Sequence, residues 1–210
     1  MAEPAVRPSS TGATGNPGAV RPGSRWRTVD IVVTAVLGVA FGVVFWAWNL
    51  LWAATGTAFT AFPPAQAVLY GVWLLPAVVA PLVVRKAGAG LFAELIAAVV
   101  SALMGSAWGA VVLLYGLLQG VAGEAGYAAF RYRRFGLPQA VLSALLAGTM
   151  AAVLDLLYYY PTWAAGWKVG YVVMVAASTM VLAGLGGTAL VRALSRTGAL
   201  SSFASGRSRV

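Results

Sequence analysis

Nine polar and aromatic side chains within long apolar stretches have the types and spacing to hold a small organic molecule. They are Asn49, Gln66, Tyr70, Trp73, Tyr115, Gln119, Asp155, Tyr158 and Tyr171. On a helix, Gln66, Tyr70 and Trp73 fall at i, i+4 and i+7, which places one amide and two rings on one face. Rings stack on flat molecules or hold a cation over their faces, and a carboxylate such as Asp155 accepts hydrogen bonds from an amine. The set predicts a binding site for a flat, nitrogen-rich or cationic solute.

Most catalytic and metal chemistry lacks its residue types here. The chain has no cysteine and no histidine, so it has neither a thiolate nucleophile nor the commonest general base and metal ligand. No GxxxxGK[ST] phosphate loop occurs, so the chain cannot itself harvest ATP. Glu94 and Glu124 lie at similar depth and could form an acid–base pair, but interior packing explains them as well. We expect no catalytic residue, no metal site and no cofactor, and an intramembrane enzyme is the least favoured alternative.

The segments that carry these side chains must be surrounded by lipid. Of 210 residues, 60% are hydrophobic and only 9% are charged, whereas soluble domains are about 25% charged. Residues 31–84 contain no charge and exceed the roughly 20 residues of one membrane span, and prolines 63 and 64 divide them into two helices. We predict an all-α membrane protein whose six transmembrane helices lie near 28–50, 64–84, 91–107, 109–130, 138–160 and 167–194.

The ends of the chain and its basic residues predict the topology. Residues 1–24 are rich in Pro, Gly and Ser and predict a disordered cytoplasmic tail, residues 25–196 form the six-helix domain, and residues 197–210 form a basic cytoplasmic tail. The two termini and the turns between helices 2 and 3 and helices 4 and 5 carry 13 of the 14 Lys and Arg residues, and the other loops carry only Lys168. The positive-inside rule therefore places both termini in the cytoplasm, in a multi-pass protein of the cell membrane. Because the basic residues are scattered in short clusters, we expect no nucleic-acid partner.

This topology places the nine side chains toward the outer face. Trp and Tyr concentrate at the interfaces of any membrane protein, which accounts for most of the aromatic residues. An interfacial belt explains poorly that, of eight Trp, only Trp26 lies clearly at the cytoplasmic end. Nor does it explain the amides and Asp155, whose polar groups are costly in contact with lipid. We therefore expect an outward-opening cup.

Small residues recur at a spacing of four in the first predicted helix. Thr34, Gly38 and Gly42 form one stripe, and such stripes allow two helices to approach closely. Packing within the chain is the default explanation, and docking of a separate membrane helix is the alternative.

Five segments resemble the YkoE family of substrate-binding S components, which belong to energy-coupling factor (ECF) vitamin transporters and are linked to thiamin and its hydroxymethylpyrimidine precursor. They are Trp26-Arg27-Thr28-Val29-Asp30, Tyr70-Gly71-Val72-Trp73, Arg85-Lys86-Ala87-Gly88-Ala89 followed by Glu94, residues 116–124 (GLLQGVAGE), and Asp155. The resemblance covers residues 25–200. Ala87 departs from the family pattern, which favours proline after the basic pair.

The resemblance implies an S-component-like bundle that captures a thiamin-like vitamin from outside. Its implied partners are a transmembrane T component and two ATPase subunits. Thr34, Gly38 and Gly42 match the small residues with which S components meet the T component. A structural or assembly protein that docks partner helices and binds no small molecule is the alternative function.

Overall fold

The computed structural model describes residues 25–200, 203 and 205, and within them it contains helices and no strand. The helices are α1 (Thr28–Thr55), η1 (Gly56–Phe59), η2 (Pro63–Leu74), α2 (Leu75–Val84), α3 (Ala89–Leu103), α4 (Val111–Ala128), α5 (Leu137–Tyr158), α6 (Ala165–Ser178), η3 (Thr179–Gly186) and α7 (Gly187–Arg196). η1 and η2 are 3₁₀ helices, and η3 is a π-helix. The predicted all-α fold is confirmed.

Several of these elements join end to end into membrane-length rods. α1 continues into η1, η2 into α2, and α6 through η3 into α7, and together with α4 and α5 they give five helices long and apolar enough to cross a membrane. α3 is the sixth and shortest, with 15 residues. The predicted boundaries differ mainly at two places: the first helix runs to Thr55 rather than residue 50, and the third ends at Leu103 rather than 107.

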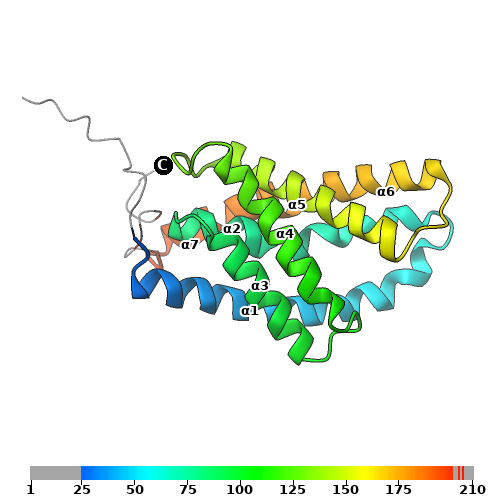
Figure 1. The fold of residues 1–210 in the computed structure, drawn as a ribbon, viewed down its shortest axis with the longest axis horizontal. Coiled ribbons are helices and arrows are strands. Elements are labelled where there is room, and N and C mark those ends of the chain that lie inside the picture. Colours follow the sequence, from blue (N-terminus) through cyan, green and yellow to red (C-terminus); the bar gives the residue numbers. More distant parts are fainter. Residues whose placement is uncertain (1–24, 201–202, 204, 206–210) are drawn as a thin grey trace, which may run out of the picture.

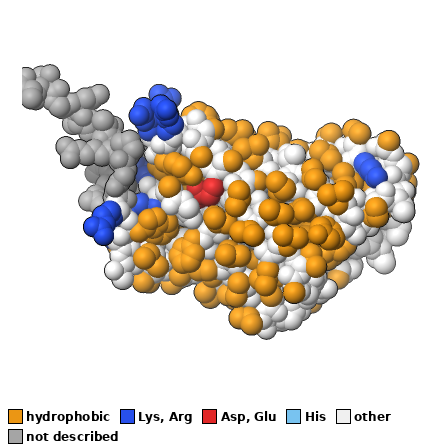
Figure 2. All heavy atoms as spheres, viewed as in Figure 1, with side chains coloured by type: hydrophobic (Ala, Val, Ile, Leu, Met, Phe, Trp, Pro, Cys, Tyr) orange, Lys and Arg blue, Asp and Glu red, His pale blue; other side chains and the backbone are white. Residues whose placement is uncertain are grey.

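The helices form an elongated bundle with the described ends of the chain at the same end (Figure 1). α1 runs along one side, α5 and α6 along the other, and the α3–α4 pair crosses obliquely between them. Lys and Arg side chains gather at the end with the termini, and apolar side chains cover the body (Figure 2). We call the end that carries the termini and these Lys and Arg side chains the basic end. The predicted tail 1–24 and most of the predicted tail 197–210 lie outside the described residues.

Two networks hold the basic end together. Asp30 forms a salt bridge with Arg27 at 2.9 Å and lies 3.7 Å from the Lys86 ammonium, so it ties the start of α1 to the α2–α3 turn. The carboxylate of Glu124 accepts hydrogen bonds from the backbone N–H groups of Gly88 (3.1 Å) and Gly90 (2.6 Å), which begin α3. It also accepts one from the Tyr132 hydroxyl at 2.9 Å. Burial and then the charge of Glu124 raise the pKa of Tyr132 to about 12, so its hydroxyl is a donor at neutral pH.

The small-residue stripe of α1 is used inside the chain. Thr34, Gly38 and Gly42 are buried, and a Cβ at Gly42 would lie 2.5 Å from the Cβ of Val100 on α3. Glycine at this position lets the two backbones approach. In this structure α3 covers the stripe, in line with packing within the chain, and docking of a T component on Thr34, Gly38 and Gly42 stays a prediction.

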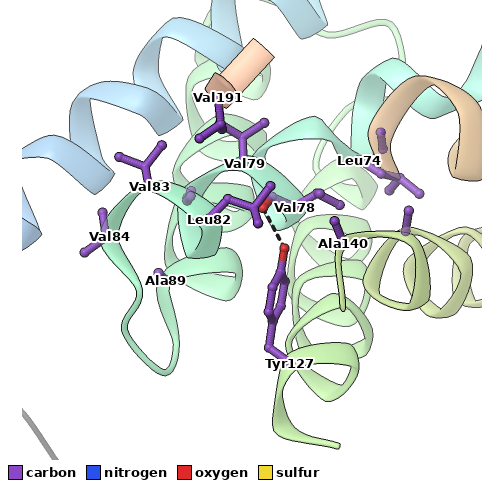
Figure 3. Close-up of a cluster of buried hydrophobic side chains, with 14 of the residues drawn as sticks. Leu74, Val78, Val79, Leu82, Val83, Val84, Ala89, Tyr127, Ala140 and Val191 are labelled. Carbon is purple, nitrogen blue, oxygen red and sulfur yellow. Dashed lines mark hydrogen bonds between the residues drawn. The ribbon is translucent and has the colours of Figure 1, made fainter. Parts of the chain in front are cut away.

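A buried cluster of apolar side chains at the basic half of the bundle surrounds α2 (Figure 3). Val78, Val79 and Val83 are at most 1% exposed. Tyr127 of α4 reaches into the cluster and donates a hydrogen bond of 2.9 Å to the Val78 carbonyl. This apolar cluster holds α2 in place. The polar and aromatic side chains described next lie toward the opposite end of the bundle.

The 12-residue 3₁₀ helix η2 is unusual, since such runs seldom exceed four residues. Ser178 of α6 donates to the Val68 carbonyl at 2.7 Å and accepts from the Gly71 amide at 2.9 Å, so its hydroxyl bridges two groups three residues apart. Trp48 donates from its indole to the Leu69 carbonyl at 2.9 Å. Side chains of other helices thus satisfy backbone groups of η2, which bare lipid could not do.

Candidate functional site

A cavity opens among the helices in the half of the bundle away from the basic end. The empty space among its lining side chains, including the open solvent at its mouth, is about 630 Å³. It is lined by Phe45, Asn49, Trp52, Tyr70, Trp73, Glu94, Ala98, Ser101, Trp108, Val112, Tyr115, Gly116, Gln119, Asp155, Tyr159, Tyr160 and Tyr171. Six helical segments and two loops contribute, so the cavity depends on the packing of the whole bundle.

Seven of the nine predicted side chains lie on this cavity. They are Asn49, Tyr70, Trp73, Tyr115, Gln119, Asp155 and Tyr171. All except Trp73 are at least nine-tenths buried. Asn49 and Tyr171, which are 122 positions apart in the chain, therefore line the same cavity.

Gln66 does not line the cavity, which corrects its place in the predicted site. Its amide donates to the Trp52 carbonyl at 2.7 Å, near the end of α1. The reason is the winding of η2. Each residue turns a 3₁₀ helix by about 120° instead of about 100°, so Gln66 lies about 120° from Tyr70 rather than about 40°. Trp73, three residues after Tyr70, lies on the same face of η2 as Tyr70, and the two ring centroids are 5.2 Å apart.

Tyr158 also points elsewhere. Its side chain is 56% exposed at the end of α5, whereas Tyr159 and Tyr160, which follow the helix, line the cavity. Because α5 ends at Tyr158, the chain turns inward only with the next two residues. Burial and then the charge of Asp155 raise the pKa of Tyr160 to about 12, so its hydroxyl stays protonated at neutral pH.

Asp155 sits in a cage of tyrosines. Its Oδ1 accepts a hydrogen bond from the Tyr115 hydroxyl at 2.7 Å, and its Oδ2 accepts one from the Tyr171 hydroxyl at 2.5 Å. The side chain is 5% exposed. Hydrogen bonds to an ionised oxygen are stronger than neutral ones, so Asp155 fixes the orientation of rings contributed by α4 and α6.

Asn49 holds a second network. Its Oδ1 accepts from the Trp73 indole at 3.1 Å, and its Nδ2 donates to the hydroxyls of Ser101 at 3.4 Å and Ser106 at 3.2 Å. The amide thus connects α1 with η2, α3 and the α3–α4 loop. Its polar atoms are used within the protein, and its main contribution to the cavity is to fix the Trp73 ring.

Aromatic rings form the remaining wall. The rings of Trp52, Tyr70 and Trp73 contact one another at centroid distances of 5.1 to 6.2 Å, and Trp108 of the α3–α4 loop meets Tyr159 at 5.2 Å. Edge-to-face contacts of this kind fix ring positions. The cavity therefore offers flat apolar surfaces around a few polar groups, an arrangement suited to a flat heterocycle.

Several residues that line the cavity were not predicted from the sequence. Trp108, Tyr159 and Tyr160 lie in loops, and their direction depends on where the flanking helices end. Glu94 was considered only as a packing residue or an acid–base partner of Glu124. The structure separates the two carboxylates by function: Glu94 lines the cavity and accepts from the Ala77 amide at 3.0 Å, whereas Glu124 braces the basic end. Over the described part of the chain, no three acidic side chains gather where they could hold a metal ion.

Known proteins match both the sequence and the arrangement. The family of ABC-type cobalt transport system permease components matches residues 29–150. The YkoE protein of Bacillus subtilis (strain 168), named for a proposed role as an HMP/thiamine permease, is 32% identical over 185 residues, covering 87% of this chain and 91% of that protein. A crystal structure of an S component of an ECF transporter superposes with a TM-score of 0.83 at 31% identity, covering 87% of this chain and 92% of that one.

This chain is a YkoE-family S component of an ECF transporter. The family resemblance of the five sequence segments is thereby confirmed. As an S component, the chain is a non-catalytic, multi-pass membrane subunit of a vitamin importer. Two of the segments are structural in this S component: residues 26–30 and 85–89 build the basic end through Asp30, Lys86 and the amide of Gly88.

Proposed function

We propose that this S component captures thiamin or its hydroxymethylpyrimidine precursor from outside the cell, in the plasma membrane. The observation that carries the proposal is the cavity, whose rings and buried polar groups match a flat, nitrogen-rich ligand with a positive charge. Thiamin combines an aminopyrimidine ring with a cationic thiazolium ring. The name of the Bacillus relative, an HMP/thiamine permease, supports the same ligand class.

The proposal assigns different tasks to the lining residues. Tyr70 and Trp73 provide surfaces on which a ring stacks. Asp155, through its tyrosine cage, supplies negative charge that favours a cation. The S component would pass its ligand to a transmembrane T component driven by two ATPase subunits, because the chain has no phosphate-binding loop of its own.

Binding of thiamin by the purified chain tests this function. In detergent or lipid nanodiscs, we expect saturable thiamin binding, measured by calorimetry and by quenching of tryptophan fluorescence. Trp73→Ala should weaken it about 10- to 100-fold, since stacking of a base on an aromatic ring contributes about 1–3 kcal/mol. Trp167→Ala is the matched control, because Trp167 is 41% exposed and away from the cavity. Absence of binding of both thiamin and hydroxymethylpyrimidine by the folded chain would refute the assignment.

A further inference from the structure

The polar groups on the cavity divide into those that protein partners occupy and those that they leave open. Both oxygens of Asp155 accept tyrosine hydroxyls, and the amide of Asn49 is bonded at its oxygen and its nitrogen. Buried polar groups without a partner are costly. An open one that faces a binding cavity therefore indicates where a ligand supplies the missing bond.

Glu94 is such a group. Its side chain is 1% exposed and lines the cavity. One oxygen, Oε2, accepts from the Ala77 amide at 3.0 Å, which holds the carboxyl group at the start of α2. Among the described residues no donor hydrogen-bonds to its other oxygen, Oε1, and this oxygen is not one of the fully buried atoms without a partner, so it is accessible from the cavity. A carboxyl oxygen accepts hydrogen bonds, so an N–H group of the ligand can donate to Oε1.

Gln119 is the second open group. It is 4% exposed, lines the same cavity, and makes no side-chain hydrogen bond within the described part of the chain. It lies on α4, whose Gly116 and Gly120 pack directly on α3 at the level of Glu94. A Cβ at Gly120 would lie 3.4 Å from the Cβ of Glu94. A carboxamide both donates and accepts, so it complements the acceptor on Glu94.

We propose that Glu94, supported by Gln119, is the residue that selects the ligand by its exocyclic amine. In the bound state Oε1 of Glu94 accepts from this amine, and the Gln119 amide donates to the neighbouring ring nitrogen. The aminopyrimidine ring then lies toward α3 and α4, and the cationic ring of thiamin lies toward the tyrosine cage of Asp155. This inference rests on the proposed function, since it assigns the orientation of the same ligand in the same cavity.

The geometry favours Glu94 over Asp155 as the direct contact for two reasons. Each oxygen of Asp155 already accepts a tyrosine hydroxyl, so a ligand donor would have to share an oxygen with that hydroxyl or displace it, and displacement would leave a buried hydroxyl unsatisfied. Glu94 needs no such displacement, because its bonded oxygen and its open oxygen are different atoms. The ligand therefore completes the hydrogen bonding of Glu94 and leaves the cage intact.

Glu94→Gln tests the inference with the fold preserved. A glutamine oxygen can still accept from the Ala77 amide, and the amide nitrogen, which is a donor, then takes the open position. We expect thiamin and hydroxymethylpyrimidine to bind about 10- to 100-fold more weakly, because the amide nitrogen cannot accept a hydrogen bond from the exocyclic amine of the ligand. Glu124→Gln is the matched control: Glu124 is also a buried glutamate that accepts a hydrogen bond from a backbone N–H at the start of another helix, but it does not line the cavity, and the ligand affinity of this variant should stay unchanged.

A change in the ligand provides a second readout that a purely structural role would not move. Oxythiamin carries a carbonyl where thiamin carries the amine, so it presents an acceptor to Glu94. The wild-type chain should prefer thiamin strongly, and Glu94→Gln should reduce this preference, since an amide can turn its donor toward the carbonyl.

The outcomes separate the two proposals. If the wild-type chain binds neither thiamin nor hydroxymethylpyrimidine, the proposed function fails. If it binds them and Glu94→Gln leaves both the affinities and the preference over oxythiamin unchanged, only the assignment of Glu94 is overturned. Equal losses of affinity without a change in preference would also overturn it, because they indicate a packing role.

Discussion

Asp155 illustrates at the residue scale how a buried carboxylate can organise a site through its neighbours. It lies one helical turn from the end of α5 and receives one hydroxyl from α4 and one from α6. Three helices are thereby joined at a single side chain. The rings of Tyr115 and Tyr171, and through Tyr171 also that of Tyr70, keep their positions because of this junction.

Asp155→Asn should weaken thiamin binding about tenfold. The amide nitrogen of asparagine replaces one of the two carboxylate oxygens and cannot accept, so the tyrosine hydroxyl at that position loses its acceptor at a cost of about 1–3 kcal/mol. The loss of negative charge should affect the cationic thiamin more than the neutral hydroxymethylpyrimidine. Calorimetry with both ligands measures the difference. Identical affinities of variant and wild type for thiamin would exclude a role for the cage in binding.

Residue types and helical spacing were enough to place seven of the nine predicted side chains on the cavity, because Asp155, Gln119 and the amide of Asn49 are too polar to face lipid. They were not enough for Gln66 or Tyr158. The direction of Gln66 depends on the 3₁₀ winding of η2, and that of Tyr158 depends on the last turn of α5. Glu94 was recognised as unusual, but only the open oxygen seen in three dimensions relates it to a ligand.

At the scale of elements, the packing of α1 on α3 shows how glycine sets the distance between two membrane helices. Gly38 and Gly42 meet Ile96 and Val100 across this interface. The opposite face of α1 is exposed and carries valines such as Val36 and Val43. A partner that packs on α1 in this conformation contacts that valine face instead of the small-residue stripe.

Gly42→Leu should destabilise the chain by about 1–3 kcal/mol or more, because a side chain there overlaps Val100 and the Ala97 carbonyl and forces α1 away from α3. Thermal unfolding in detergent, followed by circular dichroism, would show a lower midpoint. Gly166→Ala is the control, since a Cβ at this exposed position meets no atom within 4 Å. A midpoint equal to that of the control would contradict the close α1–α3 contact.

Unusual windings of η2 and η3 escaped the sequence analysis, although the positions of the rods did not. Apolar length and charge position fix where a chain can cross a membrane. The local winding depends instead on tertiary contacts, such as the hydroxyl of Ser178 between the Val68 carbonyl and the Gly71 amide. Ser178 lies more than 100 positions from both Val68 and Gly71 in the chain, so no local sequence pattern reveals these contacts.

At the scale of the whole molecule, positive charge is distributed unevenly along the long axis, with most of it at the basic end. The α4–α5 turn carries the exposed arginines Arg131, Arg133 and Arg134, and α6, whose first turn contains Lys168, begins at the end of the bundle opposite the termini. The cavity lies in the half near Lys168. The positive-inside rule predicts that the basic end lies in the cytoplasm, and we therefore expect the cavity to lie toward the outer surface.

Single cysteines can test this orientation, because the chain has none of its own. On intact cells, a membrane-impermeant maleimide should label Gly166→Cys, beside Lys168. It should label Arg133→Cys only after the membrane is made permeable. The cysteine-free chain gives the background. The reverse pattern would mean that the cavity faces the cytoplasm, and capture from outside would then be excluded.

The 3₁₀ winding of η2 also constrains how the length of this segment can vary. Three residues complete one turn of such a helix and lengthen it by about 6 Å, so an insertion of three leaves the direction of every later side chain unchanged. An insertion of one would turn Trp73 by about 120° relative to Gln66 and out of the cavity. Related chains that retain this winding and differ in length between the proline pair and Tyr70 should therefore differ by multiples of three, rather than by the seven that preserve the register of an α-helix.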